Sequence, residues 1–257
     1  MTRTFTVVGG DERFVKLREL LISGAYKTTD SLKDADAVIL PLPFRWSDEI
    51  MDQLRPSQLI FAGRVSREDS TRAKAKGLIL HDYFAREELA VANSVATAEG
   101  SVEIAIRETP IALWNASVLV IGFGRLGKVL AQRFKSLGAD VTVSARSYSD
   151  KSWISVYGYR AADTGSLGPD LSTYDVVINT VPALILTHER LLHLKSDCLL
   201  IDLASVPGGT DFNAASELQI KTEWALSLPG KVAPLTSARI ILDTISNMLN
   251  ELEENPV

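Results

Sequence analysis

Six residues constrain the fold of this chain more than any others: Gly122-Phe123-Gly124-Arg125-Leu126-Gly127. They follow the apolar run Val118–Ile121, which predicts a buried strand, and they open an amphipathic segment that ends at Gly138. In such a sequence the first glycine permits a tight turn and the second leaves the backbone open to a phosphate, while the third lets the helix pack on the strand. This order of strand, glycine turn and helix predicts a dinucleotide-binding unit.

The end of the next predicted strand, Val141–Ala145, indicates which dinucleotide the turn takes. A site for NAD places Asp or Glu about 20 residues beyond the motif, where the carboxylate binds the ribose hydroxyls. Here that window holds Ser144-Ala145-Arg146-Ser147, and Arg146 stands 19 residues after Gly127. A guanidinium at this place can pair with the 2′-phosphate of NADP, or it can pack over the adenine of either cofactor. We expect NADP, with NAD as the alternative.

Short apolar runs alternate with helix-like segments on both sides of the glycine turn. The runs cover residues 4–8, 37–40, 59–62 and 78–80 before the turn, and 141–145, 176–179, 199–203 and 222–225 after it. Alternation of this kind predicts parallel sheets with helices on both faces. The 257 residues correspond to about 1.7 domains of ~150 residues. We therefore expect an α/β chain with two doubly wound parallel-sheet domains, the second being a Rossmann dinucleotide-binding domain.

Composition and charge exclude several classes of protein. The formal net charge of −5 argues against binding to nucleic acid or to an anionic membrane surface, since both need a surplus of Lys and Arg. A single cysteine, Cys198, cannot form an internal disulfide, and with only three histidines a structural zinc site is not expected. No signal-like segment opens the chain, and no apolar run approaches the ~20 residues of a membrane span. We expect a cytoplasmic protein without a metal.

Two polar segments follow predicted strands of the second domain: Asn179-Thr180-Val181-Pro182 and Asp202-Leu203-Ala204-Ser205. Ligands of doubly wound sheets bind beyond the carboxyl ends of the strands, so both segments should lie on the nicotinamide side. Taken singly, each has a plain alternative, because Pro182 can simply end a strand and Asp202 can cap a loop. The predicted cofactor-binding residues are Gly122, Phe123, Gly124, Arg125, Leu126, Gly127, Arg146, Ser147, Thr180, Val181 and Pro182.

Longer strings resemble the dipicolinate synthase A-subunit family. These are Val8–Arg13, Asn93–Gly100, Asp202–Phe212 and Leu228–Pro234, in addition to the glycine turn. Ala-Ser-Val-Pro-Gly-Gly-Thr-Asp-Phe and Leu-Pro-Gly-Lys-Val-Ala-Pro, within the last two strings, are far more specific than the glycine motif. The resemblance covers nearly the whole chain, although the family has Pro where this chain has Ala96, and the first domain is shorter than in longer members.

The resemblance carries implications for the domains and the activity. The family fold is similar to that of D-2-hydroxyacid dehydrogenases, in which a helix such as Val95–Thr109 crosses between domains and the final helix returns to the first domain. It implies an N-terminal substrate domain over 1–94, completed by 235–257, and a dinucleotide domain over 95–234. It also implies oxidation of a dihydrodipicolinate-type ring to dipicolinate with hydride transfer to NAD(P). The setting would be the mother cell of a sporulating bacterium, the partner would be a flavoprotein-like B-subunit, and we expect a homo-oligomer.

A dicarboxylate substrate needs hydrogen-bond donors and cations around it. The candidates are Asn93, Ser94 and Thr97 near the start of the crossing helix, Ser205, Gly209 and Thr210 in the glycine-rich loop, and Arg13 and Lys231. For Arg13 and Lys231 the alternative is a solvated surface charge, which is the usual state of such residues.

No residue stands out as the general base, and the catalytic residues are unknown from sequence. His81, just past the predicted strand Leu78–Leu80, is one candidate, although a lone histidine is more often structural. Asp211 and Glu99 are others, and Glu99 can instead stabilise the first turn of its helix. The ring proton can also pass to water.

Two other functions stay open at this point. A D-2-hydroxyacid dehydrogenase would use an Arg/Glu/His set, and the last histidine of this chain is His193, with none late in the dinucleotide domain. A non-catalytic NADP-sensing module would need no second anion-binding loop, and the polar, glycine-rich stretch Ser205–Asp211 argues against it.

Overall fold

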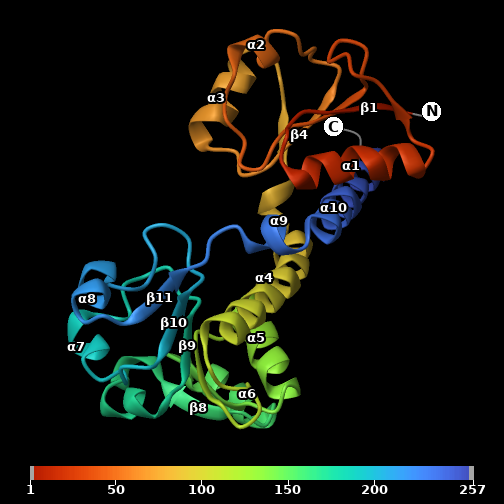
Figure 1. Cartoon of the computed structure of the whole chain (residues 1–257). Helices are drawn as coiled ribbons and strands as arrows, with labels where there is room; N and C mark the ends of the chain where they lie inside the picture. Colours follow the sequence, from red (N-terminus) through yellow and green to blue (C-terminus); the bar gives the residue numbers. More distant parts are fainter. Residues whose placement is uncertain (1–2, 255–257) are drawn as a thin grey trace. The chain divides into compact units, whose positions relative to one another are not determined.

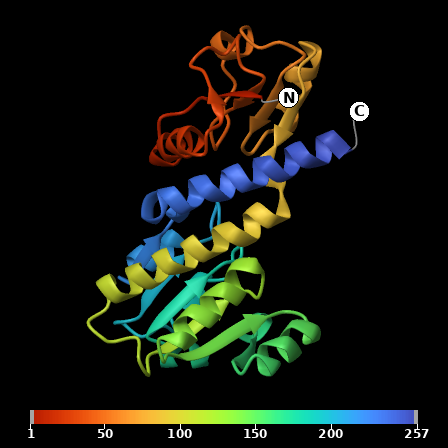
Figure 2. The same cartoon turned by 90° about the vertical axis from the view of Figure 1, so that its right-hand side faces the viewer.

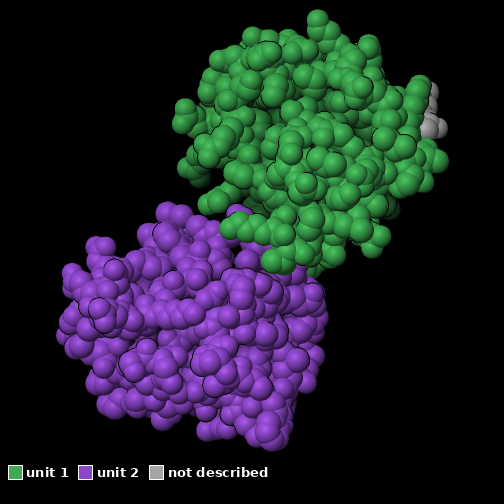
Figure 3. Space-filling view, viewed as in Figure 1, with its two compact units in different colours: residues 1–93, 229–257 green, residues 94–228 purple. Residues whose placement is uncertain are grey.

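The computed structural model describes residues 3–254, and the chain divides into two compact units (Figure 3). Unit 1 comprises residues 1–93 and 229–257, and unit 2 comprises residues 94–228. Each unit is built on its own sheet of parallel strands with flanking helices (Figure 1). The predicted α/β class with two parallel-sheet domains is confirmed.

Unit 1 holds a five-stranded sheet in the order β2-β1-β3-β4-β5. Its elements are β1 (Thr4–Val7), α1 (Glu12–Ser23), β2 (Lys27–Thr28), β3 (Ala37–Ile39), α2 (Asp48–Met51), β4 (Leu59–Ala62), α3 (Arg67–Ala75), β5 (Leu80–Asp82), the 3-10 turn η1 (Tyr83–Ala85) and α10 (Pro234–Glu254). Side chains of β3 alternate between the two faces: Ala37 and Ile39 pack against α1 and α10, whereas Val38 packs against α2 and α3. Both faces of the sheet are therefore covered.

Unit 2 holds a six-stranded sheet in the order β11-β10-β9-β6-β7-β8. Its elements are β6 (Ser117–Ile121), α5 (Arg125–Ser136), β7 (Asp140–Ala145), α6 (Tyr148–Val156), β8 (Arg160–Asp163), η2 (Thr164–Ser166), η3 (Pro169–Thr173), β9 (Val176–Asn179), α7 (His188–Leu191), β10 (Leu199–Asp202), α8 (Phe212–Glu217) and β11 (Lys221–Trp224). The strand order reverses between β6 and β9, which is the position where doubly wound sheets bind ligands.

Two helices carry the chain between the units: α4 (Glu87–Glu108) and the short α9 (Leu228–Val232). Within unit 2, α4 runs beside α5 on one face of the sheet (Figures 1 and 2), where Ala98 and Ile104 share a core with Leu130 and Phe134. The hydrophobic residues of α4 are mostly alanine and valine.

Several elements differ from those expected from the sequence. The crossing helix begins at Glu87 rather than Val95, and its first turns contain Leu89, which is buried in unit 1, and Val91, which is exposed. Strands β2 and β8 were not predicted, since both are short edge strands without an apolar run. Residues 229–234 group with unit 1, where Gly230 lies against the side chain of Arg13, although the sequence boundaries assign them to the second domain.

Among residues 3–254, none of the helices has the length and apolar character that a membrane span requires. The same residues contain no group of three or more His, Cys, Asp and Glu side chains arranged to hold a metal ion.

Candidate functional site

The glycine turn joins β6 to α5 with very close packing. Gly122 has a φ of 102°, which residues with a side chain rarely adopt, and a Cβ there would lie 2.5 Å from Oγ1 of Thr180. A Cβ on Gly127 would overlap the carbonyl oxygen of Gly122. Neither position can carry a side chain without displacing its neighbours. The first glycine thus makes the tight turn, and the third lets the helix pack closely on the strand, as the sequence predicts.

Gly124 has the opposite environment. A Cβ at this position would meet no atom within 4 Å, and Gly124 is the N-cap of α5 without a side-chain cap bond. The N–H groups of the first turn of α5 lack intrahelical partners and carry partial positive charge. Helix α5 has twelve residues, and the space in front of its first turn is open. The pyrophosphate of a dinucleotide fits such a place, so the residues present suit this cofactor.

The loop after β9 is fixed beside the glycine turn. The backbone N–H of Thr180 donates to the carbonyl of Ile121 at 3.0 Å, and the Thr180 hydroxyl donates to the same oxygen at 2.8 Å. The side chain of Val181 comes within 3.0 Å of the place where a Cβ of Gly122 would lie. The predicted residues Thr180 and Val181 therefore flank the turn at the point where the strand order reverses, and Pro182 is exposed just beyond them.

At the carboxyl end of β7 the two predicted residues behave differently. Arg146 is exposed, and its side chain forms no hydrogen bond or ion pair with any described residue. Ser147 is the N-cap of α6: its hydroxyl accepts from the N–H of Asp150 at 3.0 Å and donates to the Asp150 carboxylate at 2.7 Å. Arg146 is thus available for a ligand, whereas the hydroxyl of Ser147 is engaged in its helix.

The side chains of two residues of the glycine motif pack in the core of unit 2. The Phe123 ring is 7% exposed and lies in the core, 6.1 Å from the ring of Tyr157 and 5.3 Å from Nζ of Lys128. Leu126 also packs against this core. Their side chains thus anchor α5 on the sheet. Cofactor binding by Phe123 and Leu126 as members of the glycine motif stays a prediction, and it would use their backbone N–H groups.

A buried carboxyl group holds the loop that follows β10. Asp202 is fully buried and accepts four hydrogen bonds, from Asn179 Nδ2 at 3.0 Å, the Ala204 N–H at 2.9 Å, the Gly209 N–H at 2.9 Å and the Thr210 hydroxyl at 2.7 Å. These bonds use the backbone N–H of Gly209 and the hydroxyl of Thr210. Asp202 thus caps the loop, as its plain alternative states, and substrate binding by Gly209 and Thr210 stays a prediction. Ser205, in the same loop, is exposed.

The three candidates for a general base are engaged elsewhere. His81 lies within β5 rather than beyond it, with its ring 5.5 Å from Phe61, and burial lowers the pKa of its imidazole. Asp211 caps α8 by accepting from the Ala214 N–H at 3.0 Å. Glu99 is exposed and pairs with Arg133 at 3.3 Å, about 14 Å along α5 from Gly124.

The predicted donors of the crossing helix lie at the division between the units. Asn93 is the last α4 residue of unit 1 and Ser94 the first of unit 2. Ser94 is buried, and the carbonyl of Thr97 accepts from the Ser101 hydroxyl at 2.8 Å. The far end of α4 lies at the start of β11, where Lys221 binds Glu108 at 2.7 Å. The start of the unit 2 part of α4 is therefore directed toward the carboxyl ends of the strands.

The predicted cations Arg13 and Lys231 both belong to unit 1. The Arg13 side chain is 15% exposed, pairs with Asp11 at 2.7 Å and donates to the Leu42 carbonyl at 2.8 Å. A Cβ on Gly230 would lie 2.9 Å from Nε of Arg13, and Lys231 follows on α9, exposed and without a side-chain partner in residues 3–254. Arg13 is thus a positioned group rather than a solvated surface charge.

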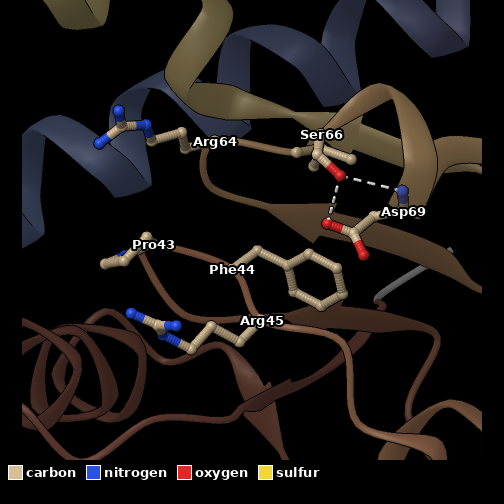
Figure 4. Close-up of a pocket in the computed structure, with 7 residues that line it drawn as sticks. Pro43, Phe44, Arg45, Arg64, Ser66 and Asp69 are labelled. Atoms are coloured by element: carbon tan, nitrogen blue, oxygen red, sulfur yellow. Dashed lines mark hydrogen bonds between the residues drawn. The ribbon is translucent and has the colours of Figure 1, made fainter.

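Arg45 and Arg64 were not singled out from the sequence. They line an open hollow of unit 1 together with Phe44 and Ser66 (Figure 4). Each follows within about six residues of an apolar strand, at the carboxyl end where parallel sheets bind ligands, and this position is the signal that could have identified them.

Comparison with known proteins agrees with these features. Residues 85–205 match the family described as D-isomer specific 2-hydroxyacid dehydrogenase, NAD binding domain. The dipicolinate synthase A-subunit of Bacillus subtilis is 38% identical over 185 residues, which span 72% of this chain and 62% of that protein. NADP-dependent alcohol dehydrogenase C 1 of Mycolicibacterium smegmatis is 34% identical over 104 residues, 37% of this chain and 30% of that protein.

The aligned segment spans 62% of the Bacillus subtilis relative, less than two thirds of its length. Solved structures match this chain over a larger share of both chains. The dipicolinate synthase A-subunit of Bacillus halodurans superposes with a TM-score of 0.87 at 29% identity, covering 97% of this chain and 98% of that chain. A transhydrogenase from Sinorhizobium meliloti shares the fold, with a TM-score of 0.78 at 14% identity over 97% and 92% of the two chains. By sequence and by fold, the chain is a relative of the dipicolinate synthase A-subunit, and its residues 85–205 match the NAD binding domain of the D-isomer specific 2-hydroxyacid dehydrogenases.

Proposed function

We propose that this protein is an NADP-dependent oxidoreductase that converts a dihydrodipicolinate-type ring to dipicolinate. One observation carries the proposal: the glycine turn leaves open space at Gly124 in a chain that is 38% identical to the dipicolinate synthase A-subunit over 185 residues. Unit 2 is the dinucleotide domain in this proposal, and unit 1 is the substrate domain.

The proposed reaction removes a hydride from one ring carbon and a proton from its neighbour. The products are dipicolinate, NADPH and one proton, and the aromatic ring that forms favours the forward direction. When bound, the nicotinamide supplies the hydride acceptor. The protein holds the ring in a reactive position and compensates its negative charge. We assign the ring proton to water, since His81, Asp211 and Glu99 are engaged in other contacts.

Arg146 supports NADP over NAD. Its unpartnered guanidinium stands directly after β7, where an NAD-specific site has a carboxylate. A relative with a matching segment of 104 residues is named as NADP-dependent. We therefore propose that Arg146 pairs with the 2′-phosphate and that the N–H groups at the start of α5 hold the pyrophosphate.

The residues proposed for substrate binding are taken unit by unit. Arg13 and Lys231 supply positive charge from unit 1, and Ser205 supplies a hydroxyl from the exposed loop of unit 2. Asn93, Ser94 and Thr97 are proposed as polar contacts from α4.

The relative's name denotes one subunit of a synthase. We extend this to the present chain and propose that a flavoprotein-like B-subunit is its partner, that the chain forms a homo-oligomer, and that it acts in the mother cell of a sporulating bacterium.

A second candidate function is oxidation of a D-2-hydroxyacid, since residues 85–205 match the 2-hydroxyacid dehydrogenase domain. In unit 2 the only histidines are His188 and His193, at α7 and just after it, far in sequence from the position such enzymes use. Dipicolinate formation is therefore the preferred assignment.

The test mixes the purified protein with NADP and freshly prepared 4-hydroxytetrahydrodipicolinate or dihydrodipicolinate, with and without a B-subunit. The absorbance of reduced nicotinamide and of dipicolinate is followed together. Turnover supports the proposal. Absence of turnover under both conditions refutes it, and turnover of D-lactate instead would favour the second function.

A further inference from the structure

An open hollow of about 520 Å³ lies in unit 1 between the loops that follow β3 and β4 (Figure 4). It is lined by Pro43, Phe44 and Arg45 from the first loop, by Arg64, Val65 and Ser66 from the second, and by Asp69 of α3. The volume is in the range of small-molecule sites. Its place beyond the carboxyl ends of two parallel strands is where α/β sheets bind ligands.

The backbone around the hollow is fixed by hydrogen bonds. The N–H of Phe44 donates to the carbonyl of Gly63 at 2.7 Å, which joins the two loops. The N–H groups of Arg64 and Val65 both donate to the carboxylate of Asp82, at 2.9 Å each, which joins the second loop to β5. The two arginines therefore project from backbone that is already ordered, so a ligand does not have to order these loops when it binds.

The guanidinium groups of Arg45 and Arg64 are free. Both side chains are exposed, and neither forms a hydrogen bond or ion pair with any residue in the described part of the chain. Figure 4 shows them extending to the same side, with Pro43 between them. By contrast, Arg13, Arg72 and Arg86 of the same unit are each held in an ion pair. Two free guanidinium groups on one side of a hollow suit an anion with two charged ends.

One carboxylate lines the same hollow. Asp69 accepts a hydrogen bond from the Ser66 hydroxyl at 2.7 Å, and its N–H donates to that hydroxyl at 3.0 Å. This carboxylate therefore belongs to the N-terminal cap of α3. The two guanidinium groups outnumber it, so the hollow is locally positive in a chain whose formal net charge is −5. An anion is favoured there over a cation.

From these features we infer that Arg45 and Arg64 form a subsite that binds the carboxylates of a planar ring dicarboxylate, with Pro43 and Phe44 as its apolar wall. The identity of the ring rests on the proposed function, whereas the charge and shape of the subsite come from unit 1 alone. Arg45 and Arg64 determine substrate specificity for a dicarboxylate over a monocarboxylate.

The test is calorimetric titration of dipicolinate, the stable product, into the full-length protein without cofactor. The variants are Arg45→Gln and Arg64→Gln, and Arg67→Gln is the matched control, because Arg67 is an exposed neighbour that does not line the hollow. We expect each of the first two to weaken binding about 10-fold or more, the usual effect of losing a charged hydrogen bond. The control should bind as wild type does, and NADPH titration verifies that every variant is folded.

The outcomes separate this inference from the proposed function. Unchanged affinity in Arg45→Gln and Arg64→Gln overturns the subsite, and so does an equal loss in Arg67→Gln, which would indicate unspecific surface charge. Failure of the wild-type protein to bind dipicolinate also overturns it. In each case turnover of the dihydrodipicolinate-type substrate by wild-type protein decides the proposed function independently.

Discussion

At the scale of single residues, the three glycines of the turn make separable contributions. Gly124→Ala adds a methyl group into open space, so we expect stability to fall by less than about 1 kcal/mol, the difference between Gly and Ala as a helix cap. NADPH binding should nevertheless weaken strongly, because the proposed function places the pyrophosphate in that space. Gly127→Ala should instead destabilise the fold by several kcal/mol through overlap with the Gly122 carbonyl. Thermal unfolding and NADPH fluorescence titration distinguish these two effects.

Arg146 provides a second residue-scale prediction. Arg146→Ala removes the proposed partner of the 2′-phosphate, so the affinity for NADP should fall about 10-fold or more while that for NAD changes little. Parallel titrations with NADPH and NADH measure this ratio. An equal loss for both cofactors would contradict the assignment and favour packing of the guanidinium over adenine.

His81 gives a prediction for pH dependence. Burial lowers the pKa of its imidazole below the ordinary value of 6.5, so the unfolded chain takes up the proton first as the pH falls. Stability from this group is therefore complete above pH 6.5 and declines from there down to the lower pKa of the folded state. Urea unfolding of wild type and His81→Gln between about pH 7 and pH 5 tests this, and the variant should show a weaker decline. Identical pH profiles would contradict it.

At the scale of elements, the loops after β9 and β10 depend on one carboxyl group. Asp202→Ala leaves the N–H groups of Ala204 and Gly209 and the hydroxyl of Thr210 without their buried partner. We expect a loss of about 3 kcal/mol or more in the free energy of unfolding. Ser205→Ala, an exposed change in the same loop, is the control and should cost little. Equal stabilities in urea unfolding would show that the carboxyl group does not organise the loop.

The sequence predicts elements best where local pattern and burial agree. Strand β6, the glycine turn and α5 combine an apolar run, a fixed glycine spacing and an amphipathic stripe, so all three could be located from the chain alone. Strand β8 could not, because its Arg-Ala-Ala-Asp residues at the sheet edge carry no apolar signal. The bond from the Thr210 hydroxyl to Asp202 could not be predicted, because it is defined by folding of the loop rather than by sequence spacing.

At the scale of the whole molecule, some exposed cations lie at places where ligands are expected, although the formal net charge of the chain is −5. Arg45, Arg64, Arg146 and Lys231 are exposed and lack ion pairs within residues 3–254. The first three follow the carboxyl ends of strands, the side where ligands bind in parallel sheets. Because of this position, we expect small anions to bind beside these three arginines.

The division into two units gives a prediction for hydrogen exchange. NADPH binds native unit 2 in the proposed function, so it should slow exchange in β6, α5, β7 and α6 by mass action. Exchange in α1 and α10 of unit 1 should change much less. Equal protection of both units would show that they unfold as one cooperative body.

The most direct test of the central claim is the stoichiometry of the reaction. Wild-type protein, NADP and a dihydrodipicolinate-type substrate should give NADPH and dipicolinate in equimolar amounts, since one hydride leaves each ring. Arg146→Ala should slow both products together at limiting NADP. Dipicolinate formed without NADPH, or NADPH formed without dipicolinate, would contradict the proposed reaction.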